Sequence, residues 1–209
     1  MKGFFVVAAL LLASTFAAAQ KADAAFVVGG SFVSDTNGTV IIPPPLGGGT
    51  ANVTVKSDHH LFFEGALGVR VLDAKAVSLH IEVPIAATPS TKLTEPITST
   101  TLDHITTLFI TPALRVKFLP GAPVSPWVSG GGGWARYSLK DASLTQNKAA
   151  LQYGGGLDFK TGLPVLGFRA EVRDFVTGDP DFNLGSLFST KSGLHHHNIL
   201  LGGGIVLRF

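Results

Sequence analysis

The chain has 209 residues and a formal net charge of +2, and only 14% of its residues are charged, against about a quarter in an average soluble protein. A charge this small and dispersed gives no basis for a nucleic-acid partner. The sequence contains no cysteine, which excludes a disulfide framework and a cysteine-linked lipid anchor. Beyond the N-terminal segment, no apolar run approaches the roughly 18 residues that a membrane-spanning helix needs.

The N-terminal segment has the features of a secretory signal peptide. Lys2 precedes an apolar run over residues 4–12, and a small-residue stretch follows over residues 17–19. A positive start, a short apolar core and small residues before the cleavage site are typical of this export signal. We predict a signal peptide over residues 1–19, with a second candidate cleavage site at residues 22–24. Residues 20–209 are then short enough for a single domain.

Alternation of apolar with polar residues predicts eight strands in this domain, because side chains along a strand point to opposite faces in turn. The predicted strands cover residues 25–34, 60–71, 76–86, 105–118, 126–138, 149–160, 165–175 and 198–209. Connectors are short after the second, fourth and sixth strands and long after the others. The first long connector, residues 35–58, is rich in Pro and Gly, and we expect a loop there that contributes to no packed core.

Pro112 and Pro84 interrupt two of the predicted strands. Each lacks the amide hydrogen that a strand donates to its neighbour, and a closed barrel has no free edge to hide the missing donor. We therefore expect a bulge or a locally broken ladder near both prolines.

The strand over residues 126–138 is harder to orient, because four consecutive glycines interrupt the alternation. Placing Arg136 inward puts Trp134 and Val128 inward as well. This choice leaves Trp127 and Tyr137 on the outward face.

The last strand ends on an aromatic residue that continues an apolar face. The residues of this face are Ile199, Leu201, Ile205, Leu207 and Phe209. Apolar residues facing lipid and polar or small residues facing inward are what a transmembrane barrel strand needs. A soluble barrel would turn its apolar face inward instead. The predicted signal peptide, the terminal Phe209 and the outward aromatic residues favour the lipid-facing arrangement.

The outward aromatic residues fall into two sets, which we interpret as girdles at the two membrane interfaces. One set comprises Phe26, Phe118, Trp127, Phe159, Phe168 and Phe209, and the other comprises Phe32, Phe63, Tyr137 and Tyr153. Because the strand count is even and the long connectors share one side, both termini are expected in the periplasm.

With these elements the chain resembles the small eight-stranded outer-membrane barrels: the transmembrane domain of outer-membrane protein A, the opacity-type adhesins and the relatives of outer-membrane protein W. The motifs that carry the resemblance are the signal peptide, the glycine-rich strand from Trp127 to Tyr137 and the closing strand. The resemblance implies an all-β, eight-stranded antiparallel up-and-down transmembrane β-barrel in the Gram-negative outer membrane. It further implies that Phe209 is the assembly signal, that the barrel-assembly machinery and outer-membrane lipid are its partners, and that the barrel is a monomer.

Charged residues gather on the inward parity of the predicted strands. They are Glu64, Arg70, Glu82, Arg115, Lys117, Arg136, Asp158, Lys160, Arg169, Glu171 and Arg173. A charge facing hydrocarbon at mid-membrane costs about 2–4 kcal/mol for Arg or Lys, so these side chains should face the lumen and pair across it. We expect an ion-paired plug, because eight strands enclose an interior that side chains fill. The alternative is a narrow pathway or small-solute site with a basic lining.

Histidines cluster at the predicted external rim, at His59, His60, His104 and residues 195–197. Imidazoles from several strand ends bind transition metals, but the Cys or carboxylate spacing of a metal site is missing, so we predict interfacial histidines and no metal or cofactor. Catalysis would need a nucleophile beside a base, or paired carboxylates with a histidine, at the outer rim. No serine adjoins the histidines, and Asp179 and Asp181 fall in a loop, so we predict no enzyme.

These observations predict an integral outer-membrane protein with a structural or surface-interaction role. The alternatives are a small-solute channel or apolar-ligand carrier and, with less support, an outer-membrane enzyme.

Overall fold

The computed structural model describes residues 22–33, 36–42, 49–55, 60–94, 101–139, 144–178, 188–189 and 196–209. Within these ranges, no helix is long and apolar enough to cross a membrane. The predicted signal peptide, residues 1–19, lies outside the described residues.

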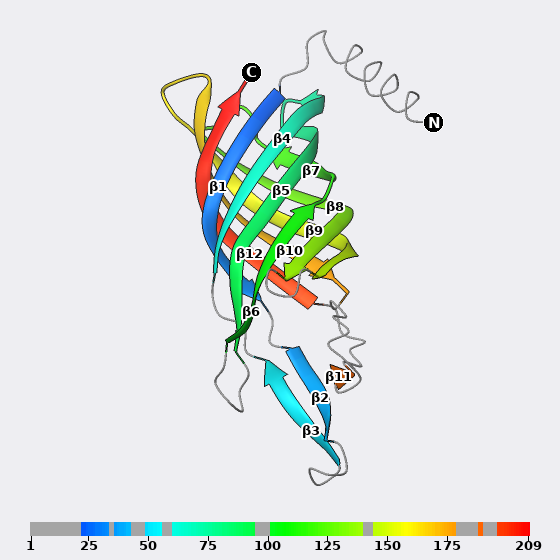
Figure 1. The fold of residues 1–209 in the computed structure, drawn as a ribbon. Helices are drawn as coiled ribbons and strands as arrows, with labels where there is room; N and C mark the ends of the chain where they lie inside the picture. Colours follow the sequence, from blue (N-terminus) through cyan, green and yellow to red (C-terminus); the bar gives the residue numbers. More distant parts are fainter. Residues whose placement is uncertain are drawn as a thin grey trace, which may run out of the picture.

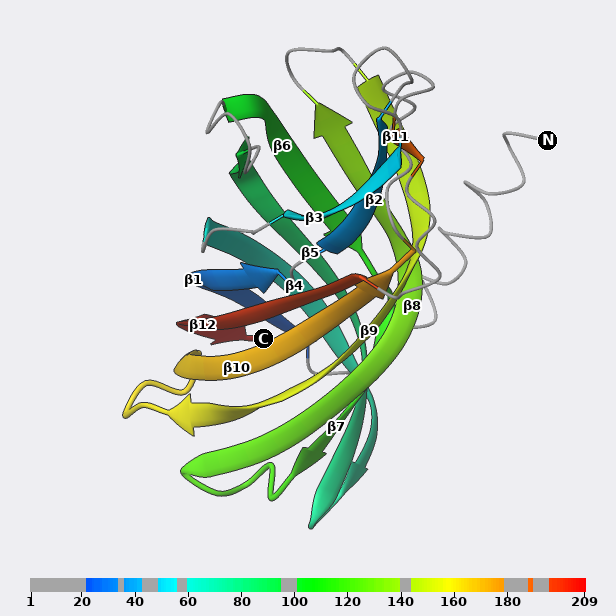
Figure 2. The ribbon, with the colours of Figure 1, turned by 90° about the horizontal axis from the view of Figure 1, so that it is seen from below.

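Nine strands form one closed antiparallel sheet (Figures 1 and 2). They are β1 (Ala22–Val33), β4 (His60–Ala74), β5 (Val77–Thr94), β6 (Thr101–Ile110), β7 (Ala113–Phe118), β8 (Val124–Leu139), β9 (Leu144–Lys160), β10 (Leu166–Thr177) and β12 (His196–Arg208). The sheet closes because β1 pairs with β12 on one side and with β4 on the other. Strands β6 and β7 together occupy one strand position in the barrel, since both pair with β5 on one side and with β8 on the other. The barrel therefore has eight strand positions, and the predicted fold class is confirmed.

The two chain ends of the barrel lie together. The amide of Phe209 donates a hydrogen bond to the carbonyl of Ala22 at 2.8 Å, and Asp23 pairs with Arg208 in the ladder. We call this end of the barrel the terminal end and the opposite one the distal end. In Figure 1 the terminal end is at the top. The three short connectors, after β4, β7 and β9, also lie at the terminal end.

The interruption at Pro112 is confirmed. Thr111 and Pro112 separate β6 from β7, and on the neighbouring strand Pro84 lies opposite this break. The amide of Thr111 still donates to the carbonyl of Pro84, and the amide of Gly132 donates to that of Pro112. The two missing donors therefore fall at one place, and a single break in the ladder accommodates both prolines.

Burial alternates along the strands in the predicted sense on seven of the eight strand positions. In β4, Leu61, Phe63 and Leu67 are exposed on the outward face, whereas Phe62 and Glu64 are almost fully buried in the lumen. The terminal strand shows the same alternation, with Phe209 70% exposed. A continuous outward apolar surface is what a barrel surrounded by lipid presents.

The predicted orientation of the remaining strand, β8, is wrong. Trp127 and Tyr137 are buried in the lumen, whereas Val128, Trp134 and Arg136 are exposed on the outward face. The four glycines carry no apolar or polar signal, so the choice rested on the charge of Arg136 alone. Trp127 and Tyr137 consequently do not belong to the aromatic girdles.

The expectation of a loop over residues 35–58 is also wrong for two stretches of that segment. Strands β2 (Thr36–Ile42) and β3 (Gly49–Val55) form an antiparallel hairpin, and β11 (Phe188–Ser189) adds a third strand. This small sheet lies beyond the distal end of the barrel in Figure 1. Most of the Pro and Gly residues occupy the centre of the segment, and the Thr and Val residues that flank them favour strands.

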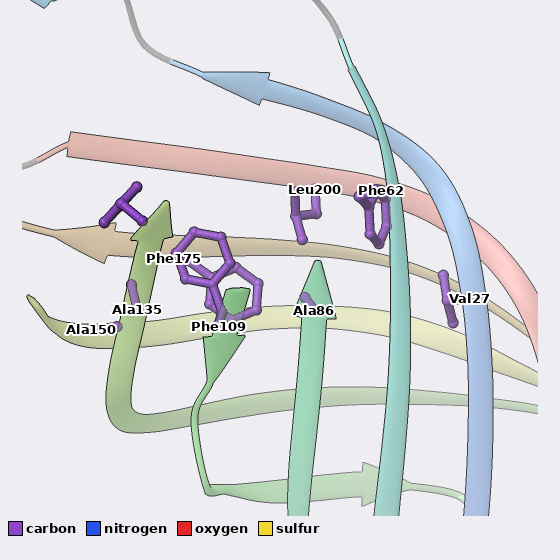
Figure 3. Close-up of a cluster of buried hydrophobic side chains, with 9 residues drawn as sticks. Val27, Phe62, Ala86, Phe109, Ala135, Ala150, Phe175 and Leu200 are labelled. Atoms are coloured by element: carbon purple, nitrogen blue, oxygen red, sulfur yellow. The ribbon is translucent and has the colours of Figure 1, made fainter. Parts of the chain in front are cut away.

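Apolar side chains fill the lumen on its distal side (Figure 3). This apolar layer consists of Val27, Phe62, Ala86, Phe109, Ala135, Tyr137, Ala150, Phe175 and Leu200. The rings of Phe109 and Phe175 stack with centroids 4.6 Å apart, and Tyr137 meets Phe109 edge-on. The hydroxyl groups of Tyr137 and Thr177 share a hydrogen bond of 2.7 Å, which satisfies the only polar atom of the tyrosine side chain.

Candidate functional site

The inward charged residues meet in one layer across the lumen, on the terminal side of the apolar layer. This charge layer consists of Asp23, Glu64, Glu82, Arg115, Lys117, Asp158, Arg169, Glu171 and Arg173, all of them buried. They come from β1, β4, β5, β7, β9 and β10. The strand alternation places them inside, because every second residue of each strand points into the barrel.

Arg173 lies at the centre of the charge layer. Its guanidinium contacts Glu82 at 2.9 Å, Glu64 at 3.1 Å and Glu171 at 3.3 Å. The same guanidinium donates to the hydroxyl of Ser129 at 3.3 Å. One planar fork with five donors thus joins carboxylates from three strands, a geometry that lysine does not offer.

Arg115 extends the charge layer toward the terminal end. Its guanidinium contacts Glu82 at 3.1 Å and Asp23 at 2.5 Å. A ring nitrogen of His80 lies 3.2 Å from the same guanidinium, and the other ring nitrogen lies 3.0 Å from the hydroxyl of Ser78. Glu82 therefore links Arg115 to Arg173, so that the two arginines belong to one connected network.

A second branch of the charge layer contains Asp158. Its carboxylate accepts two hydrogen bonds from Arg169, at 2.8 and 3.2 Å, and lies 2.5 Å from the ammonium of Lys117. Arg169 in turn lies 4.0 Å from Glu171, which joins this branch to Arg173. Two parallel N–H···O bonds give strong and well-oriented arginine–carboxylate pairs.

Trp127 packs against three of the arginines. The guanidinium carbons of Arg169, Arg173 and Arg115 lie 4.9, 5.0 and 5.9 Å from the centroid of its ring. A cation over the face of an indole ring is attracted by its quadrupole, by about 2 kcal/mol where both are desolvated. The Trp127 ring therefore fills the space between the cations and shields them from water.

Three residues predicted for the lumen network lie elsewhere. Arg136 is exposed on the outward face of β8, as described above. Arg70 and Lys160 have the inward parity but lie at the terminal mouth, where Arg70 contacts Asp73 at 2.7 Å and Lys160 donates to the carbonyl of Gly121 at 2.7 Å.

The expected excess of basic groups in the lumen is wrong as a consequence. The charge layer holds five acids and four bases, with His80 beside them. Asp23 was not predicted to belong to it, because it stands within the second candidate cleavage site. Asp23 shares the inward face of the strand with Ala25 and Val27, and this alternation could have identified it.

The rim histidines are only partly described. His59 and His195 lie outside the described residues, and nothing is described of the side chain of His104. On the outward face, a ring nitrogen of His197 lies 2.6 Å from the carboxylate of Asp174, which also accepts a hydrogen bond from Tyr153 at 2.6 Å. Among the described residues, no group of three or more His, Cys, Asp or Glu side chains is arranged to hold a metal ion. Asp179 and Asp181, weighed for catalysis, lie outside the described residues.

Comparison with known proteins supports the fold. No protein-family model and no curated protein matches the chain. Among solved structures, the chain is similar to Neisserial surface protein A, with 12% identity, a TM-score of 0.52, and coverage of 91% of this chain and 97% of that one. It is also similar to the outer membrane protein OprG from Pseudomonas aeruginosa, with 11% identity, a TM-score of 0.55, and coverage of 91% and 96%. At such low identity these likenesses show the fold alone.

Proposed function

Because the chain has the fold of the small eight-stranded outer-membrane barrels, we propose that it is an integral outer-membrane protein with a sealed lumen and a structural or surface-interaction role. The observation that carries this proposal is the filling of the lumen by two successive layers. The charge layer fills the lumen with closely paired acids and bases, and the apolar layer offers nothing to a hydrated ion. An eight-stranded interior is narrow enough for such layers to fill.

The lengths of the strands support a role at the cell surface. A transmembrane β-strand needs about 9–11 residues, whereas β5 has 18 and β9 has 17. Since the short connectors lie at the terminal end, the excess length extends from the distal end. With the termini in the periplasm, the extended strands and the small sheet of β2, β3 and β11 are on the external side, where a partner would meet them.

Export and assembly follow the same proposal. We infer that the signal peptide over residues 1–19 directs export, that the barrel-assembly machinery reads Phe209, and that the barrel is a monomer in outer-membrane lipid. Phe209 lies at the end of the outward apolar face of β12, and its side chain is 70% exposed, as a recognised residue must be.

One alternative has an observation in its favour. The apolar layer presents Phe62, Phe109, Phe175 and Leu200 to the lumen, and such a lining suits an apolar ligand. An apolar-ligand carrier would have to displace these stacked rings. An enzymatic role has less support, because the Asp174 carboxylate beside His197 is already engaged by the hydroxyl of Tyr153.

A planar-bilayer recording of the refolded chain tests the sealed lumen. We expect no ion current above the leak of the lipid alone, with an outer-membrane porin of known conductance as the positive control. Stepwise currents from the purified chain would overturn the sealed lumen and favour the small-solute channel.

A further inference from the structure

A cavity opens at the terminal end of the barrel. It has a volume of about 530 Å³, and a neighbouring cavity of about 440 Å³ shares Arg70, Pro120 and Lys160 with it. We call the two together the vestibule. Each volume lies within the range of about 300–1,000 Å³ that is usual for small-molecule sites. The charge layer borders the vestibule, because Asp23 and Lys117 belong to both.

The vestibule carries an excess of positive charge. Its basic side chains are Arg70, Lys75, Lys117, Lys160 and Arg208. Two of them are neutralised by close carboxylates, Arg70 by Asp73 and Lys117 by Asp158. Asp23, on the wall, is engaged by Arg115.

Lys160 and Arg208 have no carboxylate partner among the described residues. Lys160 donates to the carbonyl of Gly121, a neutral acceptor. The Nη2 group of Arg208 is shielded from solvent by its surroundings and makes no hydrogen bond within the described part of the chain. A buried donor without an acceptor is costly, so the charge of Arg208 is not compensated within the described part of the chain.

Gly167 sets the position of Arg208. This glycine pairs with Lys160 across the β9–β10 ladder. A methyl group built on Gly167 would lie 2.5 Å from the Nη2 atom of Arg208, so the guanidinium lies where a side chain would otherwise be. The absence of a side chain at Gly167 thus leaves room for the guanidinium of Arg208 over β10.

We propose that the vestibule binds a phosphate group, carried either by a phospholipid of the adjacent membrane leaflet or by a small solute. Arginine and lysine together are the usual ligands of phosphate, since the guanidinium fork binds two oxygens and the ammonium adds a point charge. Leu163 and Val165, which line the same cavity, are 59% and 53% exposed, and they offer an apolar surface beside the cations. This inference requires only the barrel fold and goes beyond the proposed structural role.

Calorimetric titration of the full refolded chain in non-ionic detergent with inorganic phosphate tests the soluble source. We expect saturable binding that weakens about tenfold in Lys160→Gln and again in Arg208→Gln, because each removes one charge-assisted contact. Arg136→Gln removes a cation from the outward face and should leave binding unchanged. Lys160 is exposed and bonds only one carbonyl, so Lys160→Gln is expected to fold even if Arg208→Gln does not.

Native mass spectrometry tests the lipid source. The chain is released from nanodiscs of phosphatidylcholine with and without phosphatidylglycerol, and retained lipid is counted. Retention of phosphatidylglycerol by the unsubstituted chain, but not by Lys160→Gln, supports the lipid source. Saturable binding of inorganic phosphate with the same dependence on Lys160 supports the soluble source. If neither probe distinguishes Lys160→Gln from the unsubstituted chain, the proposal is overturned.

Discussion

Arg173 contacts three carboxylates, and the structure distinguishes their contributions. Glu82 is fully buried and bridges Arg173 and Arg115 at 2.9 and 3.1 Å, whereas Glu171 lies 3.3 and 4.0 Å from Arg173 and Arg169. Breaking a buried ion pair typically costs about 3–5 kcal/mol. We expect Glu82→Gln to lower the free energy of unfolding in detergent by about this amount.

Glu171→Gln is the matched comparison. Arg173 keeps its contacts with Glu64 and Glu82 when Glu171 is lost. The charge layer also has one acid more than it has bases, so the loss of one acid leaves equal numbers. We therefore expect a smaller loss for Glu171→Gln than for Glu82→Gln. Equal losses for the two variants, measured by denaturant unfolding, would contradict the bridging role of Glu82.

Gly204 and Gly203 are adjacent residues of β12, but only Gly204 lacks room for a side chain. A methyl group on Gly204 would overlap the main chain of Phe26 in β1, whereas a methyl group on Gly203 would meet its nearest atom, the carbonyl oxygen of Arg169, at 3.6 Å. Overpacking of this kind typically costs about 1–3 kcal/mol. We expect Gly204→Ala to lower the unfolding free energy by that amount and Gly203→Ala to change it by less. The reverse order in a thermal-unfolding assay would show that β1 and β12 do not approach as closely as the ladder requires.

At the scale of the strands, the outward apolar face predicts that the cost of a charged substitution depends on its depth in the membrane. Leu67 lies in the middle of β4 and is 67% exposed, and Val165 lies in the turn at the terminal end and is 53% exposed. An arginine at mid-membrane costs about 2–4 kcal/mol, and near the interface about 0–1 kcal/mol. We expect Leu67→Arg to fold poorly into lipid vesicles and Val165→Arg to fold normally, judged by the gel-mobility shift of folded barrels. A water-exposed outer face would tolerate both.

The strands differ in how far their sequences determine them. Over residues 61–69 and 77–85 the alternation is unbroken, so the orientation of β4 and β5 could be predicted, but both strands continue past their predicted ends, to Ala74 and Thr94. In β8 the glycine run removes the alternation, so the orientation was predicted from the charge of Arg136. This charge was a poor guide, because Arg136 lies on the outward face near the end of the strand. Long cationic side chains near an interface reach the headgroups and carry a smaller cost there.

The interior was predicted less completely than the outer face. The parity of Glu64, Arg115 and Arg173 placed them in the lumen, but the partners across the barrel depend on the tilt and stagger of the strands, which sequence does not show. The apolar layer was missed because Phe62, Phe109 and Phe175 occupy the parity that was expected to be polar. In a narrow barrel the inward face is filled by the side chains that pack best there. Alternation of apolar with polar residues therefore cannot identify an apolar residue that faces inward.

At the scale of the whole molecule, the proposed role of Phe209 in assembly predicts a difference between cells and purified protein. Phe209 completes the outward face of β12, and its amide holds the chain ends together through Ala22. We expect deletion of Phe209 to lower the amount of folded barrel in the outer membrane and to leave unfolded chain in the periplasm. Deletion of Phe209 should affect refolding of the purified chain into detergent much less, since no machinery acts there. An unchanged yield in cells would contradict the role of Phe209 as an assembly signal.

The two layers of the lumen also make separable contributions to the whole barrel. Phe109→Ala combined with Phe175→Ala removes the stacked pair of the apolar layer, and each truncation of a buried phenylalanine typically costs about 3–5 kcal/mol, with less than additive effect because the rings are in contact. Phe26→Ala combined with Phe168→Ala, at two outward positions each 52% exposed, is the matched control and should cost less. Because the charge layer still fills the lumen, we expect the destabilised double variant to remain silent in planar bilayers. Ion current through this variant would show that the apolar layer alone seals the barrel and that water already reaches the ion pairs.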